Sequence, residues 1–312
     1  AMKTTAMNPH YDCLPEYREL GYVPFDKEAE SVSKTLEYAY DDYCIAQAAK
    51  VLGKTEDYEY FMKRSKHYLN LIDPETKYMR GRDSKGNWRT PFSPIAYQGP
   101  GSVHGWGDIT EGFTMQYTWT VPHDFEGYME VAGKDLLLKR LDDMFTTEMD
   151  KDIPGAHDIQ GRIGAYWHGN EPCHHVTYLY NWLGEPWKCQ KWVRTIADSF
   201  YGNEPGSLSG NDDCGQMSAW HIFNCMGFYP VAPSSNKYSI GSPCVEAVTM
   251  TMSNGKQIEM TTKNWSPKNV YVKALYVNGK LHKSPFLKYE DICNGAKLHF
   301  VMSSKPNKNV FR

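Results

Sequence analysis

Acidic side chains stand beside glycines at three points of the sequence, each just before a stretch with helical periodicity. The three segments are Gly107-Asp108-Ile109-Thr110-Glu111-Gly112, His168-Gly169-Asn170-Glu171-Pro172 and Gly210-Asn211-Asp212-Asp213-Cys214-Gly215. An acid at one such junction is ordinarily a helix cap or a first-turn residue that the helix dipole favours. Capping explains three such junctions less well than one. Each has glycine close to the acid, and glycine next to a helix is costly unless the backbone must turn sharply or approach another group closely. The carboxylates that could do chemistry are therefore Glu111, Glu171, Asp212 and Asp213.

Paired carboxyl groups are what glycoside hydrolysis needs. One must be protonated to assist the departing oxygen, and another must be ionised to activate water or to attack the sugar. The residues by themselves leave open which is acid and which is base. Aromatic residues make up 14% of the chain, and sugar rings stack on such side chains. Composition alone, however, favours the simpler interpretation of a Tyr-rich helical core.

The side chains of these segments are of types that bind calcium or zinc. A hard cation such as calcium suits the oxygen-rich set Asn170, Glu171, Asp212 and Asp213 with loop carbonyls, although no EF-hand loop is present. A zinc hydrolase is the alternative, because the histidines also cluster: His104, His123, His157, His168, His174 and His175. No pair of them has the i, i+4 spacing with an intervening glutamate that zinc-binding helices use, so we favour calcium.

Helices must position most of these residues. Residues 1–25 hold two prolines and no sustained period, so we expect an irregular lead-in. Helical periodicity then recurs over residues 31–51, 57–72, 110–120, 134–149, 172–182, 186–201 and 215–226. Aromatic and apolar stretches alternate with charged ones, as in an alpha/alpha toroid whose inner ring is wrapped by an outer ring. Inner helices of such a barrel begin at the same end, so we expect the three junctions to share one cleft.

The pattern changes after Pro230. Alternating, beta-branched stretches at residues 245–252, 257–262, 270–277 and 298–302 predict strands, and Asn278-Gly279 predicts a type I′ hairpin turn. The sequence therefore predicts a mainly α protein. Its expected parts are helical hairpins of a partial (α/α)6 toroid at residues 26–230, carrying the catalytic residues, and a small β-rich domain at residues 231–312.

Charge and composition exclude several classes of partner. The net charge of −3 gives no long-range attraction for nucleic acid or anionic membranes. No run approaches the roughly 20 apolar residues that span a bilayer, and the N-terminus lacks a signal-peptide pattern. The eight cysteines have no Cys-x-x-Cys spacing, which argues against a structural zinc site or a dense disulfide framework. We expect most of them to be buried thiols.

Several longer motifs, in this order, resemble glycoside hydrolase family 92, the calcium-dependent exo-acting alpha-mannosidases common in gut Bacteroidetes. The matching segments are Ser31-Val-Ser-Lys-Thr-Leu-Glu-Tyr-Ala-Tyr-Asp-Asp42, Thr110-Glu-Gly112, Gln116-Tyr-Thr-Trp119, Pro122-His-Asp124, His168-Gly-Asn-Glu-Pro-Cys-His-His175, Gly210-Asn-Asp-Asp-Cys-Gly-Gln-Met-Ser-Ala-Trp220 and Gly227-Phe-Tyr-Pro230. They run along most of the chain. The resemblance implies an inverting glycosidase that removes terminal alpha-linked mannose, with an alpha-1,2-mannosidase as the nearest type.

The resemblance also implies roles for single residues. Glu111 corresponds to the general acid and Asp213 to the general base. Asn211 stands where family members carry an assisting aspartate, so either Asp212 helps instead or the base works alone. Asn170 and Glu171 are the expected calcium ligands and mannose contacts, because calcium in this family binds O2 and O3 of the sugar and helps to distort its ring. The expected substrate contacts are His168, Glu171, Trp88 and Trp106.

Family members are more than twice as long, with a beta-sandwich before a twelve-helix toroid. We therefore expect this chain to be the C-terminal portion of such an enzyme, with the missing N-terminal half as its partner. The expected substrate is an alpha-mannoside glycan. The portion by itself can be inactive, because part of the sugar pocket would lie in the other half. The family implies a periplasmic, extracellular or cell-surface location. Two alternatives stay open: a relative that cleaves mannosyl phosphodiesters, against which Glu111 argues, and a non-catalytic carbohydrate-binding module.

Overall fold

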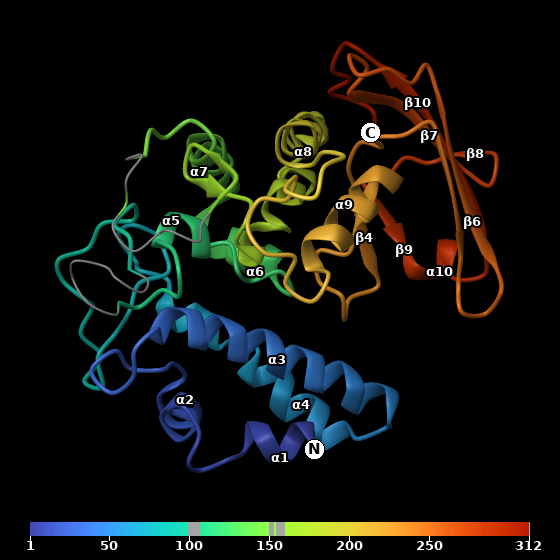
Figure 1. The fold of residues 1–312 in the computed structure, drawn as a ribbon. Helices are drawn as coiled ribbons and strands as arrows, with labels where there is room; N and C mark the ends of the chain where they lie inside the picture. The colour runs from blue at the N-terminus through green and yellow to red at the C-terminus, as the bar shows by residue number, and fades with distance from the viewer. Residues whose placement is uncertain (99–106, 150–152, 154–159, 312) are drawn as a thin grey trace. The chain divides into compact units, whose positions relative to one another are not determined.

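A computed structural model describes residues 1–98, 107–149, 153 and 160–311, and it divides into two compact units. Unit 1 is Ala1–Cys173 and unit 2 is His174–Arg312. Figure 1 shows the elements of each unit by label and colour. The boundary that the sequence predicts at residue 230 lies inside unit 2, because helices that precede it pack on strands that follow it. Asn181, for example, donates from its side chain to the carbonyl of Ile240 at 2.7 Å.

The first 25 residues are helical in two places, which corrects the expected irregular lead-in. Helix α1 is Met2–Ala6 and helix α2 is Leu14–Leu20. Pro15 does not break α2, because it lies in the first turn, where its missing N–H leaves no hydrogen bond unmade. Gly21 ends the helix in a left-handed conformation with φ of 79°. The buried Tyr17 of α2 then anchors the segment by donating its hydroxyl to Asp42 at 3.0 Å.

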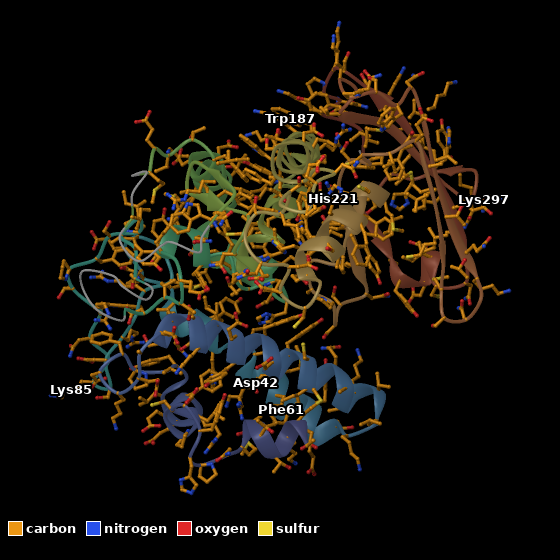
Figure 2. All side chains as sticks on the ribbon, in the orientation of Figure 1. Asp42, Phe61, Lys85, Trp187, His221 and Lys297 are labelled. Carbon is orange, nitrogen blue, oxygen red and sulfur yellow. The ribbon has the colours of Figure 1, made fainter. Side chains whose placement is uncertain are left out.

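Two antiparallel neighbours, α3 (Ser31–Val51) and α4 (Thr55–Arg64), form the longest helical pair of unit 1. Figure 1 shows them side by side in blue, and Figure 2 labels Asp42 on α3 and Phe61 on α4. Ile45 and Ala46 pack on Phe61 in an apolar cluster. Arg64 at the end of α4 pairs its Nε with a carboxylate oxygen of Asp42 at 2.9 Å, both side chains being almost fully buried. The sequence predicted α3 over the same residues.

The other elements among the described residues of unit 1 are η1 (His67–Leu71, a 3-10 helix), α5 (Thr114–Tyr117), α6 (Phe125–Ala132), α7 (Lys134–Met144), β1 (Arg162–Ile163), β2 (Tyr166–Trp167) and η2 (Glu171–Cys173). The helix predicted at residues 110–120 is reduced to α5. Glu111 adopts φ of 51° directly before Gly112, and a left-handed residue cannot continue an α-helical ladder. Helix α6 was not predicted, and the predicted 57–72 helix is divided between α4 and η1.

Unit 2 begins with helices and continues as strands. Its helices are η3 (Val176–Asn181), α8 (Pro186–Phe200), α9 (Gln216–Met226) and α10 (Tyr289–Ile292), and its strands are β3 (Phe228–Tyr229), β4 (Lys237–Ile240), β5 (Ala247–Thr251), β6 (Gln257–Lys263), β7 (Tyr271–Val277), β8 (Lys280–Leu281), β9 (Phe286–Lys288) and β10 (Ala296–Ser303). The predicted helix at residues 172–182 is not α-helical but consists of the 3-10 segments η2 and η3.

A five-stranded sheet with the order β5-β6-β10-β7-β8 dominates unit 2. Strand β10 is central, parallel to β6 and antiparallel to β7. Asn278 and Gly279 have φ of 51° and 78°, the positive pair that a type I′ turn needs, so the predicted hairpin is confirmed. A second sheet, β3-β4-β9, shares an apolar core with the first, made by side chains such as Met260, Leu275 and Phe300.

The predicted class, mainly helical with small sheets, is confirmed, whereas the partial (α/α)6 toroid stays a prediction. Helices that are both long and apolar enough to cross a membrane are absent from the described ranges.

Candidate functional site

Glu111 is exposed and has a left-handed backbone with φ of 51°. This conformation is unfavourable for a residue with a β-carbon and persists where the surroundings enforce it, as at turns, helix starts and functional sites; Glu30 before α3 and Lys77 also adopt it. Gly112 follows because a β-carbon there would lie 2.6 Å from Oε1 of Gln116. Among the described residues the Glu111 carboxylate makes no hydrogen bond or ion pair, so it is available to a substrate.

A buried carboxylate fixes the segment before Glu111. Asp108 is 4% exposed and accepts from Arg89 Nε at 2.5 Å, from the second Arg89 nitrogen at 2.7 Å and from Ser31 Oγ at 2.8 Å. Its carbonyl accepts from the first turn of α3, at the amide of Val32. Gly81 must lack a side chain, because a β-carbon there would lie 2.2 Å from an Asp108 carboxylate oxygen. Asp108 therefore positions the backbone that presents Glu111.

Asn170 joins the second junction to the first within unit 1. Its side-chain Nδ2 donates to the carbonyl of Glu111 at 3.1 Å, and its side chain also hydrogen bonds with the Tyr117 hydroxyl. Asn170 is 5% exposed and Tyr117 is buried, and burial raises the pKa of that phenol well above its usual value. The Asn170 carbonyl accepts from the amide of Cys173 and so begins η2. The structure therefore brings Glu111 and the Asn170-Glu171 pair together.

The residues of unit 1 that are expected to contact substrate differ in burial and in the side chains next to them. His168 is fully buried, and its Nδ1 lies 2.8 Å from the Tyr166 hydroxyl, so it supports β2. Trp88 is half-buried, and its ring covers the guanidinium of Arg82 at 5.0 Å. Trp106 lies outside the described residues, as do His104 and His157. None of these placements tests a contact with sugar, and all four substrate contacts, Glu171 included, stay predictions.

The third junction lies in unit 2 and has the same kind of backbone as the first. Asp213 and Cys214 are exposed and left-handed, with φ of 43° and 57°, and Gly215 follows with φ of 93°. Asp212 lies before Gly215, the N-cap of α9, and its Oδ1 accepts from the amide and the hydroxyl of Ser218 in the first turn, both at 2.9 Å. Asp213 and Asn211 are also exposed, and the Asp213 carboxylate has no partner among the described residues. The hydrogen bonds to Ser218 thus give Asp212 a structural role, whereas the Asp213 carboxylate has none of this kind in the described part of the chain.

The side-chain oxygens of Asn170 and Glu171 are of the kind that binds calcium. Glu171 supplies carboxylate oxygens and Asn170 an amide oxygen, the ligand types that calcium prefers. Clusters of three or more His, Cys, Asp or Glu side chains able to hold a metal do not occur among residues 1–98, 107–149, 153 and 160–311. Because their oxygens are of the preferred type, Asn170 and Glu171 fit as part of a calcium site. Because the described residues contain no larger cluster, sugar hydroxyls, waters or other protein oxygens would have to complete such a site. Nδ1 of His174 lies 3.0 Å from Gln216 Nε2, and His175 is buried.

Sequence reasoning missed the residues that hold the junctions in place. Asp108 lies in the first motif, but its spacing from Arg89 does not indicate that the two residues pair. An Asp beside Gly107 in a loop rich in arginine is the signal that could have indicated a buried ion pair. Tyr117 and Gln116 belong to the Gln-Tyr-Thr-Trp motif, yet nothing in their spacing indicates that they lie beside Asn170 and Gly112.

The comparisons with known proteins agree on one family. The model of the glycosyl hydrolase family 92 catalytic domain matches residues 1–304. A family GH92 alpha-mannosidase from Bacteroides thetaiotaomicron, solved in complex with mannoimidazole, is 76% identical with a TM-score of 0.98, over 99% of this chain and 41% of that one. A family GH92 inverting mannosidase from the same organism is 34% identical with a TM-score of 0.87, over 100% of this chain and 43% of that one.

A curated relative is more distant. An "uncharacterized secreted glycosidase" of Arthroderma benhamiae is 27% identical over 326 residues, which cover 94% of this chain and 39% of the relative. The chain thus spans less than half of the length of each of these proteins. The family model covers nearly all of the chain, and the motifs around Glu111 and Asp213 lie within the matched range. The chain belongs to glycosyl hydrolase family 92.

Proposed function

We propose that this chain is part of an alpha-mannosidase that removes terminal alpha-linked mannose from glycans, with alpha-1,2-linked mannose as the expected substrate. One observation carries the proposal. Glu111 and Asp213 are exposed carboxylates without partners among the described residues, and each is presented by a left-handed backbone at a loop-to-helix junction. Membership of family 92 and 76% identity to an alpha-mannosidase support the substrate class.

In the proposed mechanism, Glu111 is the general acid and Asp213 the general base. Protonated Glu111 donates its proton to the glycosidic oxygen as the bond to C1 breaks. Ionised Asp213 takes a proton from water, which attacks C1 from the opposite face of the sugar and inverts its configuration. Such a reaction needs the two carboxyl groups roughly 6.5 to 9.5 Å apart, with water between them. Asp213 acts alone or with help from Asp212, and Asn211 occupies the position of an assisting acid.

The chain's own residues hold the reacting groups. The Asn170 amide supports the Glu111 carbonyl, and the Asp108 ion pair supports the segment before it. Asn170 and Glu171 would be calcium ligands, and bound calcium would orient and polarise two sugar hydroxyls in the manner of a template. We propose His168, Glu171, Trp88 and Trp106 as residues of the sugar pocket.

The proposal extends to the rest of the enzyme. The helices of this chain would complete an (α/α)6 toroid with helices of an N-terminal half, so that the three junctions share one cleft. That half would supply further walls of the sugar pocket and influence the choice of linkage. A periplasmic, extracellular or cell-surface location is supported by the secreted relative.

The test is an assay of the complete enzyme on alpha-1,2-linked mannobiose, followed by proton NMR during the first turnovers. An inverting mechanism releases beta-mannose, which then equilibrates with the alpha form. We expect a calcium chelator to abolish turnover and added calcium to restore it. Glu111→Gln and Asp213→Asn should each lower kcat by about 10²- to 10⁴-fold. Release of alpha-mannose, or full activity after chelation, would contradict the mechanism.

A further inference from the structure

Two cysteines lie next to each other at the end of α9, in unit 2. Cys225 belongs to the last turn of the helix, and Cys244 lies in the segment between β4 and β5. The amide of Cys244 donates to the carbonyl of Cys225 at 3.3 Å, so their backbones are already side by side. Their thiols are close enough for each to shift the pKa of the other. Both thiols are partly exposed, and both are free in the structure.

The surroundings of the pair make the two thiols unequal. His221 lies one turn before Cys225 on α9, with its Nε2 3.6 Å from the Cys225 sulfur, and Figure 2 labels it. The neighbouring Cys244 thiol, followed by the contact with His221, lowers the pKa of the Cys225 thiol. The neighbouring Cys225 thiol and burial raise the pKa of the Cys244 thiol. Asn224 Nδ2 lies 3.4 Å from the Cys244 sulfur and fixes its position.

We propose that Cys225 and Cys244 form a reversible disulfide, in which Cys225 is the attacking thiol and Cys244 the resolving one. A disulfide joins residues whose α-carbons are roughly 4.4 to 6.8 Å apart, and the direct backbone hydrogen bond holds the backbones of Cys225 and Cys244 side by side. The thiolate is the nucleophile in disulfide exchange, and it forms most readily beside a histidine or another donor. Disulfides persist in oxidising compartments, which include the proposed location.

The reaction balances with a disulfide as oxidant, either a small molecule or a protein. The Cys225 thiol loses its proton to solvent, and its sulfur attacks one sulfur of the oxidant. A mixed disulfide forms, and the first thiolate of the oxidant leaves and takes up a proton. Cys244 then loses its proton and attacks the Cys225 sulfur, which expels the second thiol of the oxidant. The two cysteines have lost two electrons and two protons, and the oxidant has become two thiols.

The bridge would fasten α9 to the strands that follow it. The start of α9 carries the Asp213 junction, and its end leads through β3 and β4 to Cys244. A covalent link at the end of the helix therefore stabilises the element that presents Asp213. Cys189 differs from Cys225, because it is fully buried and burial raises the pKa of its thiol.

The experiment maps thiols after equilibration of the protein in glutathione buffers of graded redox potential. Free thiols are blocked with N-ethylmaleimide before digestion and mass spectrometry. Trypsin cleaves after Lys237, between the two cysteines, and chymotrypsin cleaves after Trp220, between Cys214 and Cys225. We expect one cross-linked pair, Cys225 with Cys244, which disappears on reduction with dithiothreitol.

Variants separate the bridge from general oxidation. Cys225→Ser and Cys244→Ser should each abolish the cross-link, whereas Cys293→Ser, a partly exposed control, should leave it intact. His221→Gln should slow its formation by about three- to tenfold without changing the final yield, because the thiolate forms less readily. Full alkylation of both thiols in the most oxidising buffer would overturn the proposal. So would glutathione that stays on Cys225, or a bridge from Cys225 to Cys214. Should a variant fail to fold, the map of the unaltered protein decides alone.

Discussion

The Asn170 side chain donates a hydrogen bond to the main-chain carbonyl of Glu111 at 3.1 Å. A residue expected to be a calcium ligand is thus tied to the backbone of the expected general acid. Since Glu111 has a left-handed conformation that a β-carbon disfavours, an outside partner for its carbonyl helps to keep it there. The amide nitrogen of Asn170 positions Glu111, while the amide oxygen would be the atom that binds a cation.

Asn170→Asp separates these two roles, because aspartate retains oxygen ligands but has no N–H donor. We expect kcat on mannobiose to fall by about three- to tenfold, as the loss of one hydrogen bond worth roughly 0.5–1.5 kcal/mol implies. The calcium concentration for half-maximal activity should not rise. Asn170→Ala, which removes both groups, should lower kcat and also raise that calcium concentration. Unchanged kcat in Asn170→Asp would show that the hydrogen bond to Glu111 is dispensable.

The roles of Glu111 and Asp213 differ in their response to the leaving group. An aryl mannoside with a strongly acidic phenol needs no proton donor, so Glu111→Gln should lose much less activity on it than on mannobiose. Asp213→Asn should lose about 10²- to 10⁴-fold on both substrates, because water must be activated in either case. Steady-state kinetics on the two substrates test the assignment. Equal losses for Glu111→Gln on both would contradict its role as acid.

The Asp108 ion pair predicts an unusually sensitive glycine. Gly81→Ala places a β-carbon 2.2 Å from the Asp108 carboxylate and must displace it from Arg89. We expect the free energy of unfolding to fall by roughly 1–3 kcal/mol, the usual effect of overpacking, and activity to fall because the segment before Glu111 shifts. The matched control is Gly206→Ala, where no atom lies within 4 Å of the added carbon. Urea unfolding compares the two, and equal midpoints would contradict the prediction.

Unit 1 should lose stability in mild acid because of His123. Its Nε2 lies 2.9 Å from the Ser65 carbonyl, tyrosine rings surround it, and burial lowers its pKa to about 4. Between pH 6.5 and 4 the unfolded chain binds a proton that the folded chain does not, so stability falls as the pH falls. The expected loss is about 2–3 kcal/mol.

His123→Gln keeps a donor for Ser65 and removes the titration, so its unfolding free energy should depend less on pH over this range. The dependence does not vanish, because burial also lowers the pKa of His67 to about 4. Hydrogen exchange of the α3 and α4 amides at pH 4.5 and 7 measures the effect in unit 1. The exposed His10→Gln is the matched control. Identical pH dependence in His123→Gln and the unaltered protein would rule out this histidine as the source.

Local signals were sufficient for α3 and for the turn at Asn278 and Gly279. The period of α3 persists over several turns, and the turn depends on two adjacent residues that tolerate positive φ. The same signals failed at residues 110–120, because apolar periodicity does not show that Glu111 leaves the helical region. The constraint on Glu111 comes from Asn170, which is distant in sequence.

The sequence predicts which loop-to-helix junctions carry the candidate site, but it does not predict the contacts that hold these junctions in place. Motifs located Glu111, Asn170 and Asp213, and the chain folds each of them as an unusual backbone or a buried anchor. The pairing of Arg89 with Asp108 was not predictable, because ion pairs between loops leave no period in the sequence. Whether Glu111 and Asp213 share one cleft stays a prediction, since they belong to different units.

The sheet order β5-β6-β10-β7-β8 also determines when the sheet can form during translation. Strand β10 is the last of the five to leave the ribosome, yet it separates β6 from β7. Until it arrives, both strands present open edges, which are templates for association with other chains. The sheet therefore closes only after translation has passed residue 303, and a premature stop before β10 should yield an aggregation-prone product that cellular proteases remove.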